Sequence, residues 1–196
     1  MNLPNKLTIL RTLMVPLMVF FLLWDLVPYH YIWALAVFIL ASLTDAVDGH
    51  IARKHHLVTN LGKFLDPLAD KVLVISALIC LLQLGSLGEV WGAVYIIVIL
   101  AREFMVTSMR LVASSNGRVV AASIWGKAKT VSQMLFIIAD MLLISISEYV
   151  MDTTLTPVLL GLALLVMALE VLSLLLTIIS GVDYIWKNRD VFRQKP

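Results

Sequence analysis

The chain has 196 residues, of which 61% are hydrophobic and only 14% are charged, and its formal net charge is +2. A soluble domain has about 45–50% apolar and about 25% charged residues, so this composition excludes an ordinary soluble globular protein. A single cysteine excludes a disulfide framework. We therefore expect one all-α integral membrane domain over residues 1–196, with no nucleic-acid partner.

Six apolar stretches are long enough to cross a bilayer, because a transmembrane helix needs about 20 apolar residues. An amphipathic N-terminal segment that contains basic residues opens the chain, and turn residues such as Pro28 and the Gly85–Gly88 segment separate the stretches. The sequence thus predicts six transmembrane helices. The expected spans are 7–24, 31–53, 61–84, 89–113, 124–147 and 156–185.

The basic residues are distributed unevenly along this pattern. All 15 Lys and Arg residues fall close to the N-terminus, the turns after the second and fourth stretches, or the C-terminus. The other turns contain acidic residues and no Lys or Arg. By the positive-inside rule, both termini and the turn after the second stretch are expected to face the cytoplasm in a multi-pass cell-membrane protein.

Four aspartates flank that turn: Asp45, Asp48, Asp66 and Asp70. A carboxylate inside a membrane costs about 2.5–3.5 kcal/mol, so a cluster of four needs a compensating partner. On helices, the spacing of three and of four residues places each pair of acids on one face. Hard carboxylate oxygens suit Mg²⁺, Mn²⁺ or Ca²⁺, and the motif therefore predicts a site for two divalent cations.

Small residues accompany the acids on the same helix faces. Gly49, Ala52 and Gly62 leave room for a ligand to approach the backbone, and Arg53 is placed to reach a phosphate from the rim. Two metal ions bridged by carboxylates are the usual apparatus for attack at phosphorus. These features favour a metal-dependent phosphotransferase over a solvated acidic turn or a purely structural cation site. A divalent-cation transporter remains an alternative.

The run D-x₂-D-G-x₂-A-R-x₈-G-x₃-D-x₃-D from Asp45 to Asp70 resembles the signature of the CDP-alcohol phosphotransferases. The resemblance implies the six-helix fold of that family, a homodimer, and two Mg²⁺ or Mn²⁺ ions. It is closest to members that transfer a phosphatidyl group from CDP-diacylglycerol to glycerol 3-phosphate, giving phosphatidylglycerol phosphate and CMP. Phosphatidylglycerol, serine or inositol phosphate remain alternative acceptors. The stretches that carry this closer resemblance are N-L-P-N-K-L-T-I-L-R at 2–11, F-L-D-P-L-A-D-K at 64–71, A-R-E-F at 101–104 and G-K-A-K-T at 126–130.

The resemblance also implies roles for individual residues. The four aspartates would be metal ligands, and Asp70 would also take the proton of the attacking hydroxyl. The cytidine and diphosphate site would be lined by residues of the signature and of the N-terminal segment, although an interfacial helix that meets lipid head groups explains the latter equally well. These nucleotide-binding candidates are Asn5, Thr8, Gly49, Ala52, Arg53 and Gly62.

A basic cluster around the turn after the fourth stretch is the candidate acceptor site: Arg110, Arg118, Lys127 and Lys129. A phosphate monoester needs such a pocket, since Arg offers paired donors and Lys a point charge. The positive-inside pattern alone would also explain these residues.

Charged residues also lie inside the expected helices. Arg102 is expected to pair with the aspartate cluster or with a substrate phosphate, and Glu103 with Lys71 or Lys127, because an unpaired charge there is costly. Two acids lie deeper, and an ion path, a dimer contact and protonated hydrogen bonding are open alternatives for them. These two are Asp140 and Glu170.

Overall fold

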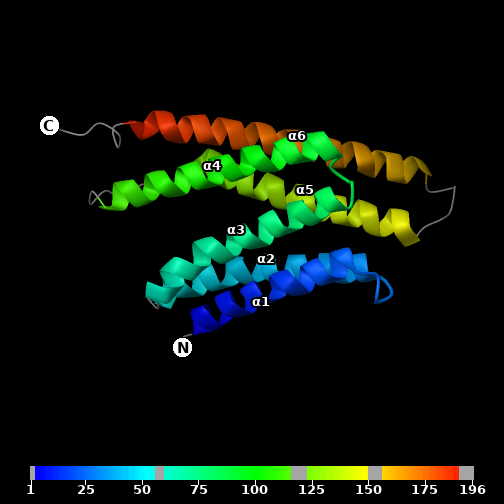
Figure 1. Cartoon of the computed structure of the whole chain (residues 1–196). Helices are drawn as coiled ribbons and strands as arrows, with labels where there is room; N and C mark the ends of the chain where they lie inside the picture. Colours follow the sequence, from blue (N-terminus) through cyan, green and yellow to red (C-terminus); the bar gives the residue numbers. More distant parts are fainter. Residues whose placement is uncertain (1–2, 56–59, 116–122, 150–155, 190–196) are drawn as a thin grey trace.

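The computed structural model describes residues 3–55, 60–115, 123–149 and 156–189, and within these ranges it leaves the side chains of residues 3–7, 45–55, 60–68, 70 and 149 undescribed. The described residues form an all-helical structure (Figure 1). Its helices are α1 (Leu3–Leu23), α2 (His30–His55), α3 (Asn60–Gln83), α4 (Glu89–Ser115), α5 (Ile124–Tyr149) and α6 (Thr156–Lys187).

The expected six helices are confirmed as helices, and their ends agree with the hydropathy pattern to within a few residues. The largest difference is at the start of the chain, where α1 begins at Leu3 instead of residue 7. The polar first turns and the apolar stretch that follows them are therefore one continuous helix.

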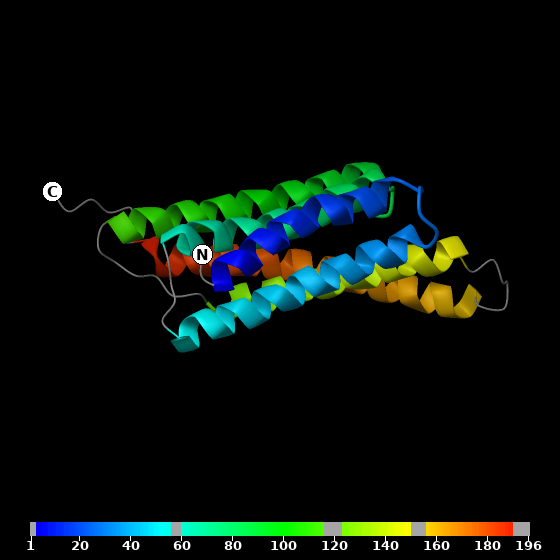
Figure 2. The same ribbon diagram turned by 90° about the horizontal axis from the view of Figure 1, so that it is seen from below.

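The helices run up and down along a common direction (Figures 1 and 2). One end of the bundle contains the start of α1, the end of α2 and the start of α3. The end of α4, the start of α5 and the end of α6 lie at that same end, which we call the signature end. In the interior, α5 packs against α6 and α2, α1 packs against α2 and α3, and α4 packs against α6 and α3.

The core between the helices is apolar. Met18 of α1, Phe38 of α2 and Leu78 of α3 are completely buried. Tyr95 of α4 and Phe136 of α5 meet edge to face, with ring centroids 5.6 Å apart. Burial of these large side chains from five helices supplies the main favourable contacts between them.

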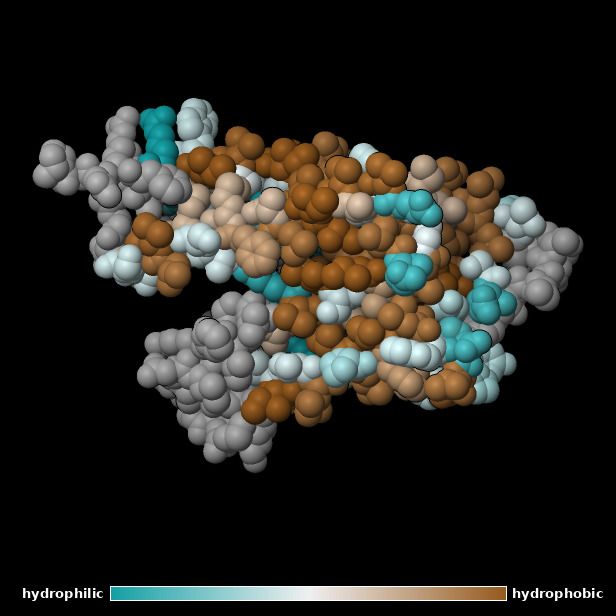
Figure 3. Space-filling view, viewed as in Figure 1, coloured by the Kyte–Doolittle hydropathy of each residue, from teal (hydrophilic) through white to brown (hydrophobic). Residues whose placement is uncertain are grey.

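The outer surface is apolar as well, with a broad hydrophobic band along the bundle (Figure 3). A soluble monomer rarely exposes apolar patches larger than a few hundred Å². Of the described helices, three are long and apolar enough to cross a membrane: Glu89–Ser115, Ile124–Glu148 and Thr156–Lys187. The described parts of α1, α2 and α3 contribute shorter apolar segments. The chain is accordingly a membrane protein.

The connection between α3 and α4 is a tight turn that depends on glycine. Gly85 and Gly88 adopt φ angles of 78° and 68°, in the left-handed region that side chains disfavour. Just inside α4, a Cβ atom on Gly92 would lie 2.6 Å from Cβ of Leu87 and 2.7 Å from Cδ1 of Leu82. Gly92 therefore allows the turn to pack directly onto the first turn of α4.

Candidate active site

The aspartate motif is divided between two consecutive helices. Asp45 and Asp48 belong to the C-terminal part of α2, and Asp66 and Asp70 to the N-terminal part of α3. Both parts lie at the signature end (Figure 1). The side chains of these four residues lie outside the described residues, as do those of Asn5, Ala52 and Arg53 and the surroundings of Gly49 and Gly62 among the nucleotide-binding candidates.

The polar face of α1 points into the bundle. Thr8 and Arg11 are both completely buried, and Arg11 is the largest fully buried side chain among the described residues. Of the two alternatives for this segment, the interfacial helix among lipid head groups does not hold at these two positions. Burial of a guanidinium inside a membrane bundle is expensive, so Arg11 requires polar or charged neighbours at this position.

A polar network begins directly after the motif, at Lys71 of α3. The ammonium group of Lys71 lies 3.9 Å from Oε2 of Glu103 in α4 and donates a hydrogen bond to Oγ1 of Thr107. Oε1 of Glu103 accepts hydrogen bonds from Nη1 of Arg102 at 2.7 Å and from Nζ of Lys129 at 3.0 Å. One carboxylate thus meets three cations from three helices.

The expected partner Lys71 of Glu103 is confirmed by this geometry. The second expected partner, Lys127, is exposed, and the contact from α5 comes from Lys129 instead. Residues two positions apart on a helix point in nearly opposite directions. A prediction that misplaces the rotation of α5 about its axis therefore exchanges Lys127 for Lys129. Arg102, for which we expected an aspartate or a substrate phosphate, donates to its own neighbour Glu103.

Two glycines make room for Arg102. A Cβ atom on Gly126 of α5 would lie 3.4 Å from Nη2 of Arg102, and one on Gly181 of α6 would lie 3.3 Å from its Cγ. The distance at Gly181 is tighter than most real Cβ contacts, and the distance at Gly126 is at the lower limit of ordinary contact. Sequence analysis did not single out Gly181 as a functional residue, and nothing in its local sequence distinguishes it from a glycine at a helix contact.

The remaining members of the basic cluster divide into three cases. Arg110 is exposed, donates from Nε to the hydroxyl of Tyr184 at 3.3 Å, and stacks its guanidinium 5.7 Å from the centre of that ring. Lys127 is exposed on the first turn of α5, while Lys129 is buried. Arg118 lies outside the described residues. The three described members therefore come from two helices, α4 and α5, of which the end of α4 and the start of α5 lie at the signature end.

The two deep acids are hydrogen-bonded at the opposite end of the bundle. Oδ1 of Asp140 accepts a hydrogen bond from Ser86 at 2.5 Å, and Oε1 of Glu170 accepts one from Nε1 of Trp91 at 2.7 Å. Of the alternatives for these acids, the structure bears out hydrogen bonding within the chain. The hydrogen bond from Trp91 also links the start of α4 to α6.

Among the residues whose side chains are described, no group of three or more His, Cys, Asp or Glu side chains is close enough to hold a metal ion. The four aspartates of α2 and α3 lie outside that search, and carboxylate oxygens such as theirs are the ligands that hard cations take. The described network beside them is predominantly cationic. The two together suit a reaction between two phosphate-bearing substrates, with one at the acids and one at the bases.

Comparison with known proteins agrees with the motif. Residues 1–180 match the family model for CDP-alcohol phosphatidyltransferase. The chain is 45% identical over 152 residues to a CDP-diacylglycerol–glycerol-3-phosphate 3-phosphatidyltransferase of Bacillus subtilis (strain 168), covering 72% of this chain and 77% of that protein. It is 38% identical over 143 residues to a protein of the same name from Pseudomonas fluorescens, covering 70% and 71%. It is 39% identical over 188 residues to a probable phosphatidylglycerophosphate synthase of Mycobacterium tuberculosis (strain ATCC 25618 / H37Rv), covering 94% and 80%.

Proposed function

The chain belongs to the CDP-alcohol phosphatidyltransferase family, and from that membership we propose that it transfers the phosphatidyl group of CDP-diacylglycerol to sn-glycerol 3-phosphate. The products are phosphatidylglycerol phosphate and CMP. The observation that carries this proposal is the complete aspartate signature on α2 and α3, in a chain whose relatives are named for this reaction. The enzyme is a membrane-bound transferase of phospholipid biosynthesis.

The proposed metal ligands are Asp45, Asp48, Asp66 and Asp70, because their oxygens match the preference of Mg²⁺ and Mn²⁺. Two such ions, when bound, would neutralise the phosphate oxygens of the diphosphate and of the departing CMP. The placement of the acids on helix backbones next to a connection at one end of the bundle supports a shared site. We assign the cytidine and diphosphate contacts to Asn5, Thr8, Gly49, Ala52, Arg53 and Gly62.

In the proposed reaction Asp70 accepts the proton of the C1 hydroxyl of glycerol 3-phosphate. The hydroxyl oxygen attacks the phosphorus that carries diacylglycerol, and a new P–O bond forms. The bond from that phosphorus to the bridging oxygen breaks, and CMP leaves with the bridging oxygen. Positioning and electrostatic stabilisation are sufficient for such a transfer, so no covalent intermediate with the protein is needed.

The acceptor phosphate is proposed to bind the basic cluster of Arg110, Arg118, Lys127 and Lys129. Arg110 and Lys127 are exposed near the signature end, where a polar substrate enters from water. The uneven distribution of Lys and Arg supports a cytoplasmic location for this end and both termini. CDP-diacylglycerol would keep its acyl chains in the surrounding lipid, and we propose a homodimer as the functional unit.

The test of the reaction is the lipid product made by purified protein from CDP-diacylglycerol, glycerol 3-phosphate and Mg²⁺. We expect phosphatidylglycerol phosphate and one CMP per lipid. The acceptors phosphatidylglycerol, serine and inositol phosphate, supplied in parallel, should give no product. A lipid product with one of these acceptors and none with glycerol 3-phosphate would contradict the assignment of the acceptor.

The test of the site is Asp70→Asn, with Asp45→Asn in parallel. A general base contributes about 10²–10⁴-fold to the rate, and Asp70 is also a proposed metal ligand, so Asp70→Asn should reduce CMP release by at least that factor and abolish it in a standard assay. Asp25→Asn is the matched control, since Asp25 is exposed in the connection between α1 and α2 at the opposite end. All variants should remain monodisperse in detergent, and wild-type turnover by Asp70→Asn would refute its role as the base.

A further inference from the structure

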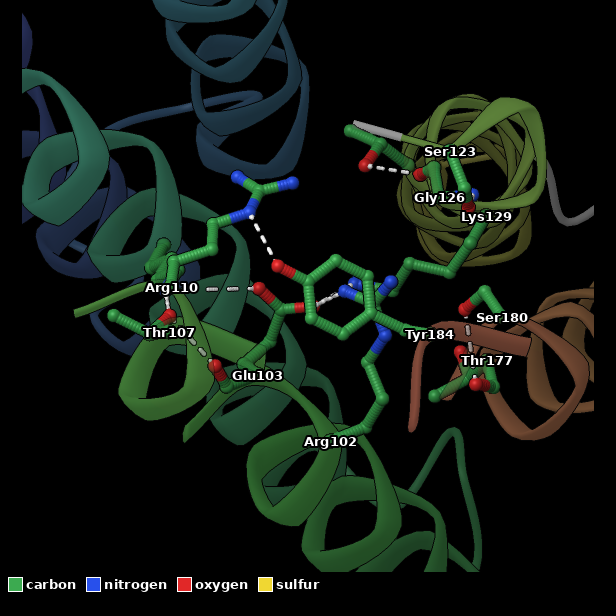
Figure 4. A network of polar contacts seen from close by, with 12 residues as sticks. Arg102, Glu103, Thr107, Arg110, Ser123, Gly126, Lys129, Thr177, Ser180 and Tyr184 are labelled. Carbon is green, nitrogen blue, oxygen red and sulfur yellow. Dashed lines mark hydrogen bonds and ion pairs between the residues drawn. The ribbon is translucent and has the colours of Figure 1, made fainter. Parts of the chain in front are cut away.

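The carboxylate of Glu103 is the centre of a compact group of charges. It lies 2.7 Å from Arg102, 3.0 Å from Lys129 and 3.9 Å from Lys71. We call these four residues the Glu103 cluster. Figure 4 shows that Arg102, Glu103 and Lys129 converge on one point between α4, α5 and α6.

The cluster is largely withdrawn from water. The side chain of Lys129 is 5% exposed, that of Arg102 12% and that of Glu103 16%, while Lys71 is 26% exposed. Three cations this close repel one another strongly where the dielectric constant is low. The negative charge of Glu103 makes their assembly possible, and among the described side chains this group has three positive charges and one negative charge. A phosphate monoester carries about two negative charges near neutral pH.

Hydrogen-bond donors at the cluster are also left over. Nε of Arg102 and Nε2 of Gln133 are buried and have no hydrogen-bond partner. Gln133 is 1% exposed and lines a cavity of about 30 Å³ together with Lys71, Glu103, Lys129 and Thr130. A buried donor without a partner is costly, so the site is suited to a ligand that brings acceptors. The cavity itself has room for about one water molecule, so a phosphate would bind at the open side, beside Lys71.

The cluster is held from several helices at once. Thr107 accepts a hydrogen bond from Lys71 and donates one to the backbone oxygen of Glu103 at 2.7 Å. Gly126 and Gly181 provide the space that Arg102 occupies. Because Lys71 directly follows Asp70, this arrangement ties the cations to the part of α3 that carries the aspartate motif.

We propose that Glu103 is a positioning residue, which holds Lys71, Arg102 and Lys129 assembled so that Lys71 and Arg102 join Lys129 of the basic cluster in receiving the phosphate of the acceptor. This inference rests on the proposed function and adds to it a fixed internal counter-ion. Glu103 itself carries the wrong charge to bind phosphate. It acts through the cations, whose separation it sets before the substrate arrives.

The test is Glu103→Gln, which keeps the size of the side chain and removes its charge. Without the carboxylate the three cations separate, so KM for glycerol 3-phosphate should rise about tenfold or more, the effect of one lost charge-assisted hydrogen bond. KM for CDP-diacylglycerol should stay unchanged and kcat should change much less. Inorganic phosphate, used as a competitive inhibitor, should lose affinity by the same factor as glycerol 3-phosphate.

Glu170→Gln is the matched control, because it makes the same substitution at another buried helical glutamate, one that is bonded to Trp91 at the other end of the bundle. Its KM for glycerol 3-phosphate should equal that of the wild type. Glu103→Asp keeps the charge on a shorter side chain, so its KM for the acceptor should lie between those of the wild type and Glu103→Gln. If Glu103→Gln does not fold, Glu103→Asp alone decides, with an increase in KM for the acceptor and an unchanged kcat as the expected result.

An unchanged KM in Glu103→Gln would overturn the inference. A lower KM would also overturn it, because Glu103 would then be a competitor of the phosphate. Either result leaves the proposed function intact as long as the wild-type protein makes phosphatidylglycerol phosphate. Absence of that product from the wild-type protein would instead refute the proposed function.

Discussion

The substitution Gly92→Ala tests how closely the turn between α3 and α4 packs against the first turn of α4. The added Cβ would lie 2.6 Å from Cβ of Leu87 and 2.7 Å from Cδ1 of Leu82, well inside the 3.4 Å at which ordinary contact begins. Cδ1 of Leu82 is the end of a flexible side chain and can move. Cβ of Leu87 is one bond from the backbone of a turn that is hydrogen-bonded to Gly92 through Gly88, so relief there must shift the turn itself.

The control is Gly161→Ala in α6, where an added Cβ meets nothing within 4 Å. Both substitutions gain up to about 1 kcal/mol of helix propensity. Only Gly92→Ala also carries the cost of overpacking, about 1–3 kcal/mol. The free energies of unfolding of the two variants should therefore differ by about 1–3 kcal/mol, with Gly92→Ala the less stable.

The assay is the apparent midpoint for heat-induced loss of the monodisperse protein in detergent, measured at one fixed heating rate. For a chain of this size about 1 kcal/mol corresponds to about 2–4 °C, so the midpoints should differ by at least about 2 °C. A fixed rate is needed because membrane proteins that aggregate on heating report a rate instead of an equilibrium. Equal midpoints, or a more stable Gly92→Ala, would refute the claim that the turn is closely packed at this glycine.

Two further predictions concern the opposite end of the bundle and the metal. Ser86→Ala removes the hydrogen bond to the buried Asp140 and should lower the free energy of unfolding by about 0.6–2 kcal/mol. The control Ser147→Ala removes only a local hydrogen bond on an exposed helix surface and should change the free energy of unfolding little. Equal midpoints of thermal unfolding for the two variants would contradict this prediction. Removal of divalent cations with a chelator should abolish CMP release and added Mg²⁺ should restore it, and turnover that continues in excess chelator would count against the metal site.

The helices were predictable because the bilayer imposes one strong requirement on sequence. A span needs an apolar stretch of nearly fixed length, and the turns between spans are marked by glycine, proline and charge. The predicted stretch 61–84 became α3 at Asn60–Gln83, and 124–147 became α5 at Ile124–Tyr149. The aspartate motif was as easily recognised from the sequence, since intramembrane acids at helical spacing have few structural explanations.

The partners of individual charges were not predictable to the same degree. From the sequence, Lys127 and Lys129 are equally good candidates for the partner of Glu103. Only the rotation of α5 about its axis decides between them. Arg11 likewise has the sequence environment of an interfacial arginine but is buried, because α1 continues through it as one helix packed on α2 and α3. Hydropathy reports how deep a residue lies and carries little information on which neighbour it faces.

Polar contacts along α4 connect these observations. Trp91 and Tyr95 bond to Glu170 and Ser173 of α6 at the far end, and Arg110 bonds to Tyr184 of the same helix near the signature end. Because apolar helices gain little from one another in lipid, such hydrogen bonds and close contacts do much to decide their register. With its register against α6 set at both ends, α4 presents Glu103 to the cations of α3 and α5 at a fixed height. The position of the Glu103 cluster relative to the aspartates of α3 is thus set by contacts between α4 and α6, including those at the opposite end of the bundle.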